Sequence, residues 1–270
     1  MTELITPLLP VFAHTALFIA GFFVLTLWVI SVAMRDSSIV DIFWGLGSAA
    51  VAWVAWITVG GGDTRATLVL VVATAWGLRL GLYIGIRNWG AEDRRYARLR
   101  QHVTEQGRNY ALYSLRAVFG LQGLLMFLCT MPVVVAIAMP SSGPPSLLVW
   151  IGFGLSAAGL TVEALADWQM ARFRRQRQSP GEVMDKGLWR YSRHPNYFGE
   201  MLVQWGVYLM ACDAGLIGIL TIFAPALLSA MIMGPLGANL LERRLGKKNP
   251  GYQDYIRRTS AFIPWPPRQH

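Results

Sequence analysis

The chain has 270 residues, of which 54% are hydrophobic and only 14% are charged. A soluble domain carries roughly a quarter charged residues, so the composition excludes an ordinary soluble enzyme and indicates a polytopic membrane protein. The net charge is +9, and its distribution along the chain indicates membrane topology, with no nucleic-acid partner expected.

Apolar runs of about 20 residues, the length that crosses the hydrocarbon layer as a helix, recur along the chain. We predict an all-α fold with about seven transmembrane helices, forming a single transmembrane domain over residues 1–270. The sixth run is short, so six or eight helices are alternatives. The predicted spans are 8–34, 40–60, 66–86, 116–139, 147–169, 196–212 and 214–240.

The basic residues predict the orientation of these helices. Of the 24 Lys and Arg residues, only Arg65 and Arg79 lie away from the ends that share one side of the predicted membrane. The positive-inside rule makes that side cytoplasmic, with the N-terminus outside and the C-terminus inside. Lys is scarce beside Arg, which indicates a GC-rich bacterial genome and therefore the bacterial plasma membrane. The first helix lacks a convincing cleavage site, so we expect it to be retained as a span.

The second and third helices carry polar side chains at their cytoplasmic ends. Asp41 opens the second helix, where a carboxylate either offsets the helix dipole or belongs to a site. On the third helix, Arg79, Tyr83 and Arg87 follow at intervals of four residues and share one face. An arginine about two turns inside an apolar span is costly unless it faces a cavity or a partner. The alternative is that Arg79 snorkels to the inner headgroups.

Other patterns predict packing and carry no chemistry. The stretch Gly45-Leu46-Gly47-Ser48-Ala49-Ala50 matches the loose dinucleotide pattern G-x-G-x-x-A, but no strand precedes it, so we predict close helix packing. The cysteines have no spaced partners and the histidines are scattered, so no metal site is expected. Pro225 and Pro235 should kink the seventh helix.

The fifth helix should begin after Ser146 and end at Pro180-Gly181, well beyond the length needed to span. Its inner end carries Glu163, Asp167 and Arg174 at offsets of 4 and 7, which places the three on one helix face. A solvated edge with snorkelling arginines is the alternative. Two carboxylates on an apolar helix that ends in a basic run favour a site.

Residues 187–200, Gly-Leu-Trp-Arg-Tyr-Ser-Arg-His-Pro-Asn-Tyr-Phe-Gly-Glu, are a dense polar and aromatic stretch between apolar runs. Such a cluster is costly beside hydrocarbon unless it binds something, so we expect a polar cofactor or a substrate headgroup here. Asn196, Glu200 and Gln204 form another stripe at four-residue spacing on the sixth helix. Together with the stripes of the third and fifth helices, it should line one cytoplasmic pocket.

Further candidates for cofactor binding lie within this stretch and after the seventh helix. The later ones either line the pocket wall or anchor the chain at the interface. These candidates are Tyr191, Arg193, His194, Tyr197, Glu242, Tyr252 and Tyr255.

The segment from Arg193 to Glu200 resembles the RHPNYxG[DE] motif of the sterol reductases related to the lamin-B receptor. Residues 163–267 resemble the steroid 5-alpha-reductase superfamily, most closely an uncharacterised bacterial branch that shares the 187–200 stretch. An early Asp-x-x-Trp motif, here Asp41 and Trp44, belongs to the same likeness, and residues 160–267 match best as the cofactor-binding half. The related isoprenylcysteine and phospholipid methyltransferases are similar over the same region.

The reductase resemblance implies seven helices, NADPH entering from the cytoplasm, and hydride transfer to an activated carbon–carbon double bond of a lipid or steroid-like enone. Carried over by position, the cofactor-holding residues are Asp167, Arg174, Asn196 and Glu200. Arg79 and Tyr83 resemble a family Arg-x-x-x-Tyr, and Arg87 or Arg177 would meet the extra phosphate. Arginine forks suit a diphosphate and a 2′-phosphate.

The sequence departs from the family where the acid should be. The steroid reductases use a glutamate and a tyrosine on early helices, but Trp76 stands at the tyrosine position and the second helix has no Gln-Glu pair. Enone reduction needs an acid to polarise the carbonyl, and the candidates here are Asp41, Tyr83 and a protonated Glu163. This departure from the family pattern weakens the expectation of a steroid substrate more than the expectation of an NADPH cofactor.

Two other functions compete with the reductase. An S-adenosylmethionine-dependent membrane methyltransferase would bind its cofactor in the same region, but that cofactor has no phosphates and leaves Arg79, Arg174 and Arg177 without a role. A non-enzymatic lipid-binding membrane protein would not require inward carboxylates beside arginines.

Overall fold

The computed structural model describes residues 6, 8–88, 90, 92–141, 143–179, 181–234, 237–238, 242 and 250–268. Throughout those residues, every regular element is a helix. Six segments are long and apolar enough to cross a membrane: Leu8–Met34, Ile39–Thr58, Thr64–Arg87, Tyr110–Cys129, Leu147–Gln176 and Leu216–Met233. The chain is therefore an all-α, multi-pass membrane protein, as predicted. The count of seven spans and the orientation stay predictions.

Contacts within the chain group into two compact units. Unit 1 holds Met1–Trp150 and Tyr208–Ala224, and unit 2 holds Ile151–Val207 and Pro225–His270. The expectation of a single transmembrane domain over residues 1–270 stays a prediction.

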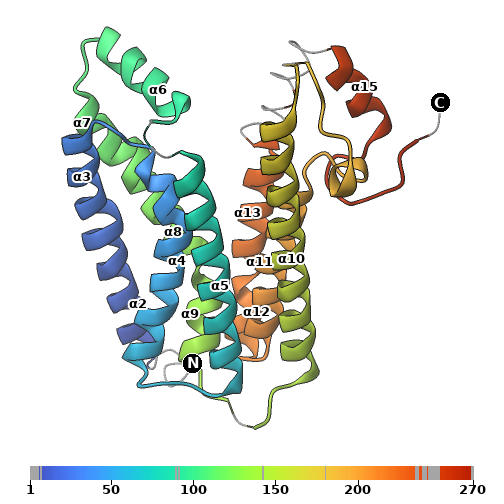
Figure 1. Cartoon of the computed structure of the whole chain (residues 1–270). Helices are drawn as coiled ribbons and strands as arrows, with labels where there is room; N and C mark the ends of the chain where they lie inside the picture. The colour runs from blue at the N-terminus through green and yellow to red at the C-terminus, as the bar shows by residue number, and fades with distance from the viewer. Residues whose placement is uncertain are drawn as a thin grey trace. The chain divides into compact units, whose positions relative to one another are not determined.

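Unit 1 begins with a long helix that changes pitch in its middle. An α-helical start and end flank a π-helical stretch, η1. Helices α4 and α5 follow, and the shorter helix α6 lies beyond the end of this bundle (Figure 1). The elements are α2 (Leu8–Phe18), η1 (Ile19–Thr26), α3 (Leu27–Met34), α4 (Ile39–Thr58), α5 (Thr64–Arg87) and α6 (Arg94–Glu105).

Glycines bring α4 and α5 into backbone contact. A Cβ on Gly45 would lie 2.7 Å from the carbonyl oxygen of Gly77, and one on Gly47 would meet the Met126 side chain at 2.8 Å. The glycine stretch that matches the dinucleotide pattern therefore packs helices together, as predicted.

The fourth predicted span, 116–139, differs from the structure. Helical residues begin earlier, at α7 (Tyr110–Ser114), and continue through the π-helical η2 (Leu115–Gly120) and α8 (Leu121–Cys129). The helix stops at Thr130, and α9 (Met131–Ala138) starts afresh with Pro132 in its first turn. Pro132 has no backbone N–H to continue the ladder, whereas its ring suits the start of a new helix.

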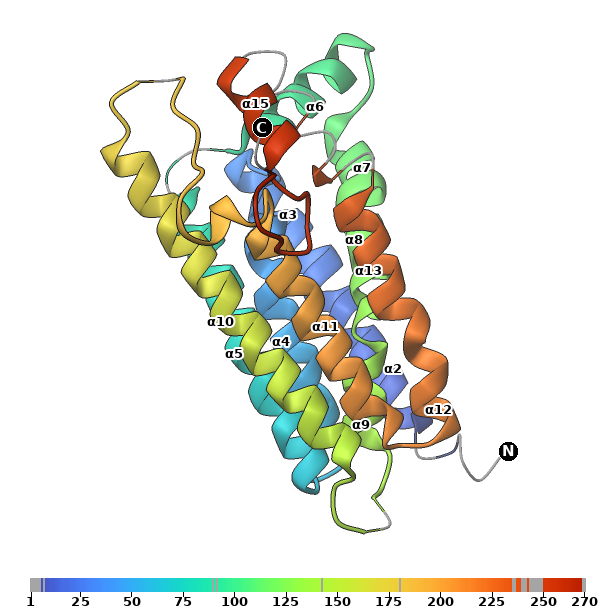
Figure 2. The same cartoon turned by 90° about the vertical axis from the view of Figure 1, so that its right-hand side faces the viewer.

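Unit 2 is built on the longest helix of the described chain, α10 (Leu147–Gln176). It starts directly after Ser146 and ends shortly before Pro180-Gly181, as predicted. Helix α11 (Pro195–Cys212) runs beside it, and α13 (Phe223–Met233) lies on the other side of α11 (Figure 2). A 3₁₀ turn, η3 (Gly187–Arg190), and the short α15 (Pro250–Arg258) belong to the polar segments at one end.

The sixth predicted span, 196–212, is present as the helix α11, but it is not among the helices apolar enough to cross by composition. Its polar residues, among them Asn196, Glu200 and Gln204, account for that. The seventh span begins with α12 (Leu216–Ile219) and the 3₁₀ turn η4 (Leu220–Ile222), just before Pro225 where a kink was predicted. Pro235 lies outside the described residues.

Candidate functional site

Helices α10 and α11 touch through a glycine contact near the end that carries the polar groups. A Cβ on Gly199 would lie 2.7 Å from both the Gly159 carbonyl oxygen and the Glu163 Cγ. A second contact joins Gly206 to Ser156, whose hydroxyl also donates to the Val203 carbonyl oxygen at 3.2 Å. The small residues allow the two backbones to approach closely, as is typical of membrane helix pairs.

This contact buries the two carboxylates of α10. Glu163 is 1% exposed and Asp167 is 6% exposed. With Leu147 at one hydrocarbon boundary, a rise of 1.5 Å per residue puts Glu163 about 24 Å and Asp167 about 30 Å along the helix. Both therefore lie in the last quarter of a hydrocarbon layer of about 30 Å. Ionisable groups at that depth are typical of functional sites.

Asn196 connects the two helices at this level. Its Nδ2 donates a hydrogen bond to Asp167 Oδ1 at 3.3 Å. One turn further along α11, Gln204 Nε2 donates to Glu200 Oε1 at 3.4 Å. The structure therefore brings together the predicted residues Glu163, Asp167 and Asn196, and it places Glu200 on the stripe that Asn196 begins.

Arg174 and Arg177 lie just beyond the carboxylates, at the end of α10 and after it. Both are exposed. Neither forms an ion pair with an acidic residue of the described chain. Exposed guanidinium groups without a carboxylate partner are available to a phosphate, which they can contact through paired N–H donors.

Arg193 holds the C-terminal chain. Its Nε and Nη2 donate to the two carboxylate oxygens of Glu242, and its Nη1 donates to the carbonyl oxygens of Ile256 and Thr259. Burial alone would raise the pKa of Glu242, but hydrogen bonds from His194 and Arg193 outweigh it and lower that pKa to about 2. Glu242 is therefore ionised, and its charge stays matched by Arg193.

His194 belongs to the same cluster. Its Nε2 lies 2.8 Å from Glu242 Oε1. The ring stacks with Tyr197, at 5.4 Å between centroids, and with Phe262, at 5.5 Å. Because the ring is 3% exposed and already makes these contacts, His194 has a structural role in docking the tail.

The two tail tyrosines are buried in unit 2. Tyr255 donates to the carbonyl oxygens of Trp189 and Ser192, and burial raises its pKa. Burial and the nearby Glu242 charge raise the pKa of Tyr252 to about 12. The tail also pairs with the polar stretch where Trp265 N donates to the carbonyl oxygen of Tyr191, whose side chain is exposed. These tyrosines therefore fix the polar stretch to the C-terminal chain.

In unit 1, the predicted α5 stripe is present on one helix. Arg79 and Tyr83 are half-buried and Arg87 is exposed. The Arg87 guanidinium lies 5.8 Å from the Tyr83 ring centroid, and its Nε donates to Asn88 Oδ1 at 3.1 Å. The expectation that this stripe shares a pocket with α10 and α11 stays a prediction.

Asp41 joins α4 to α6. Arg95 Nη2 donates to its Oδ2 at 2.6 Å, and the Tyr96 hydroxyl donates to its Oδ1 at 2.7 Å. Gln122 donates in turn to the Tyr96 oxygen at 3.1 Å. Burial and the Asp41 charge raise the pKa of Tyr96, which keeps its proton on the hydroxyl. The contacts of Asp41 are those of an anchor for α6.

Two residues that support the site were not among the predicted site residues. Gln169 Oε1 accepts from Leu188 N at 3.0 Å, and Trp189 Nε1 donates to the Ala166 carbonyl oxygen at 3.1 Å. Together they hold the polar stretch against α10 beside Asp167. Trp189 belonged to the polar stretch, but neither residue repeats at a helical spacing with the predicted candidates.

Comparison with known proteins gives a family. A family model described as "Protein of unknown function (DUF1295)" matches residues 27–259. The chain belongs to this family. It is also similar to "Uncharacterized protein C594.04c" of Schizosaccharomyces pombe, with 28% identity over 265 residues that cover 88% of this chain and 75% of that protein. No solved structure matches the chain.

Both matches cover the two units. The family region includes the α4 and α5 stripes as well as the α10–α11 pair and the start of the tail. The arrangement described above is therefore that of a family member over nearly its whole membrane domain.

Proposed function

We propose that this protein is an NADPH-dependent membrane reductase that acts on an activated carbon–carbon double bond of a lipid or steroid-like enone. The observation that carries the proposal is the pair of buried carboxylates, Glu163 and Asp167, with the half-buried Asn196 hydrogen-bonded to Asp167, directly before exposed arginines. The resemblance of the 187–200 stretch to the sterol reductases supports the same function.

The residues present fit a phosphorylated dinucleotide. Arg174 and Arg177 offer guanidinium groups that no carboxylate of the described chain neutralises, and such groups suit a diphosphate and a 2′-phosphate. Asn196 offers both a donor and an acceptor, as the carboxamide of a nicotinamide requires. When bound, NADPH would supply a hydride to the β-carbon of the double bond.

The remaining chemistry falls to the side chains of this chain. A proton must reach the other carbon, and an acid near the carbonyl oxygen must stabilise the charge that develops there. Glu163 is the better candidate on α10, because it is almost fully buried and its Cγ lies at the contact with Gly199 of α11. Asp41 is less suited, because Arg95 already holds it as an ion pair.

Arg193, His194 and Tyr255 act through position in this proposal. They fix the stretch before α11 and so set the position of Asn196 in the first turn of that helix.

Under the proposed orientation the site opens to the cytoplasm of a bacterium, because the basic segments flank it. The expectation that Arg79, Tyr83 and Arg87 of α5 also contact the cofactor stays a prediction.

The second candidate is an S-adenosylmethionine-dependent methyltransferase. The shared motif region supports it, but a cofactor without phosphates leaves Arg174 and Arg177 unused. Titration of the purified full-length chain in lipid nanodiscs separates the two. We expect binding of NADPH about tenfold or more tighter than of NADH, because of the 2′-phosphate, and no binding of S-adenosylmethionine.

Two variants sharpen this test. Arg174→Ala and Asn196→Ala should each weaken NADPH binding about tenfold or more, which corresponds to one lost charged or paired hydrogen bond. Arg175→Ala, a neighbouring arginine on another face of α10, is the matched control and should bind as the unaltered protein does. Binding of S-adenosylmethionine with no binding of NADPH would overturn the proposal.

A further inference from the structure

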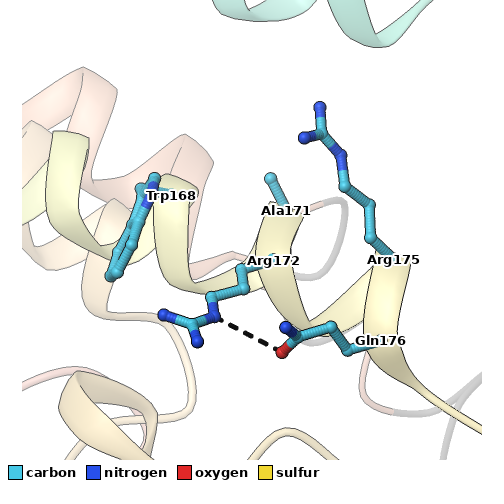
Figure 3. Close-up of a pocket in the computed structure, with 5 residues that line it drawn as sticks. All are labelled: Trp168, Ala171, Arg172, Arg175 and Gln176. Atoms are coloured by element: carbon cyan, nitrogen blue, oxygen red, sulfur yellow. Dashed lines mark hydrogen bonds between the residues drawn. The ribbon is translucent and has the colours of Figure 1, made fainter.

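Helix α10 carries a second face of polar and aromatic residues, separate from its carboxylates. Five residues from three successive turns line a pocket of ≈ 310 Å³ on this face (Figure 3): Trp168, Ala171, Arg172, Arg175 and Gln176. At 100° per residue this face is turned by about a third of a turn from the face of Glu163 and Asp167. A cofactor held by Arg174 would therefore leave it uncovered.

The arginines of this face are arranged around a small residue. The Arg172 guanidinium lies 5.7 Å from the Trp168 ring centroid, and its Nε donates to Gln176 Oε1 at 3.4 Å. Arg175 extends away from this pair (Figure 3). Ala171 fills little of the space between them. Among the described residues no carboxylate pairs with Arg172 or Arg175, so the face carries two uncompensated positive charges.

The position of this face along α10 matches the edge of a lipid leaflet. Counted from Leu147, Trp168 lies about 32 Å along the helix, whereas Arg172 and Arg175 lie about 38 and 42 Å along it. A hydrocarbon layer of about 30 Å therefore ends near Trp168. The long side chains of both arginines lean back toward the helix N-terminus and so reach the headgroup layer. Trp168 is 56% exposed. A tryptophan at the boundary followed by arginines is the usual interfacial order.

We propose that this face binds the phosphate of an anionic phospholipid, in the leaflet on the side of the basic segments. The phosphate lies over Ala171 and accepts from Arg172 and Arg175, while Trp168 packs against the glycerol and the first acyl methylenes. Charge selects the lipid: two unpaired guanidinium groups favour a net negative headgroup over a zwitterionic one. This site is independent of the proposed reductase activity.

The test measures phosphatidylglycerol retained by the purified full-length chain, by native mass spectrometry from micelles that hold equal amounts of phosphatidylglycerol and phosphatidylcholine. We expect the unaltered protein to be enriched in phosphatidylglycerol. The double variant Arg172→Gln/Arg175→Gln should weaken this binding on the order of tenfold. Millimolar inorganic phosphate should leave it unchanged, because the acyl contacts to Trp168 are part of the site.

The matched control is Arg174→Gln/Arg177→Gln, which removes the same charge from neighbouring positions and should keep the enrichment. The Arg172→Gln/Arg175→Gln variant should bind NADPH as the unaltered protein does, which separates this inference from the proposed function. The inference fails if both double variants lose phosphatidylglycerol equally, if neither does, or if inorganic phosphate displaces the lipid. An unchanged thermal midpoint shows that each variant is folded.

Discussion

Arg193 meets Glu242 through both carboxylate oxygens, at 2.8 Å from Nε to Oε1 and 3.0 Å from Nη2 to Oε2. Two residues 49 positions apart in the chain are thereby joined in a bidentate pair. Their side chains are only 11% and 13% exposed. Such a pair fixes geometry as well as charge, so it sets how the C-terminal chain docks on the stretch that begins α11.

Removing one partner of this pair should destabilise unit 2. We expect Arg193→Ala to lower the free energy of unfolding by about 3 kcal/mol, because it leaves a largely buried carboxylate without its cation. Denaturant unfolding in detergent measures the loss, and limited proteolysis should release residues 250–268 sooner. Asp254→Asn is the control, since that carboxylate is exposed and its pairs contribute less than about 1 kcal/mol. Equal effects of the two substitutions would contradict this role.

Docking of the tail should weaken in acid. The pKa of Glu242 falls from its ordinary value of 4.5 to about 2 in the folded chain. A carboxylate with a depressed pKa stabilises the fold fully above its unfolded value, and that contribution is lost as the pH falls from about 4.5 towards 2. Thermal unfolding between pH 7 and pH 2.5 measures this. The Glu242→Gln variant should lack this part of the slope; a slope identical to that of the unaltered protein would exclude Glu242 as its source.

Adding one methyl group at the α10–α11 contact should push the helices apart. A Cβ on Gly199 would lie 2.7 Å from Gly159 O, so we expect Gly199→Ala to cost about 1–3 kcal/mol and to disturb Glu163 beside it. Gly154→Ala on α10 is the control, because nothing lies within 4 Å of its Cβ. The control should be neutral or more stable by up to about 1 kcal/mol. Unfolding of both variants in the same detergent gives the comparison.

The link between α4 and α6 depends on a single hydroxyl as well as an ion pair. Tyr96→Phe should cost about 1–2 kcal/mol, because Asp41 loses a hydrogen bond in a largely buried place. Hydrogen exchange of the α6 amides should speed up while that of α5 stays the same. Gln101→Ala, which breaks only an exposed bond to Glu105, serves as the control. Unchanged exchange in α6 after Tyr96→Phe would show that the Tyr96 hydroxyl is not needed to hold the helix.

The elements that the sequence predicted best are those whose signal is local. The start of α10 after Ser146, its end before Pro180-Gly181 and the packing role of Gly45 each depend on residues close in sequence. The polar spacing of Glu163 and Asp167 likewise follows from helical periodicity, and the structure buries both.

The break at Thr130, which the prediction of one span over 116–139 missed, has a local signal in the sequence. Pro132 marks the start of α9, and its missing N–H explains why a helix from 116 to 139 does not continue. The π-helical stretch Ile19–Thr26 has no comparable marker. It depends on tertiary packing, which hydropathy does not record.

The contacts of the polar stretch at residues 187–200 join residues that are far apart in the sequence, so local patterns could not predict them. Arg193 was expected to bind a cofactor, yet its guanidinium is occupied by Glu242 and two tail carbonyl oxygens. Tyr255 similarly donates to Trp189 across 66 positions. A motif can show that residues matter, but it does not show whether they touch a ligand or each other.

The length of α10 has a practical consequence for establishing topology. Its 30 residues span about 45 Å, some 15 Å more than the hydrocarbon layer. The residues after Gln176 therefore lie beyond the hydrocarbon layer, at the end of one continuous helix. A single cysteine placed at Gln178 would be reachable by a membrane-impermeant maleimide from one face only, and labelling intact cells against inverted vesicles would reveal which compartment that face meets.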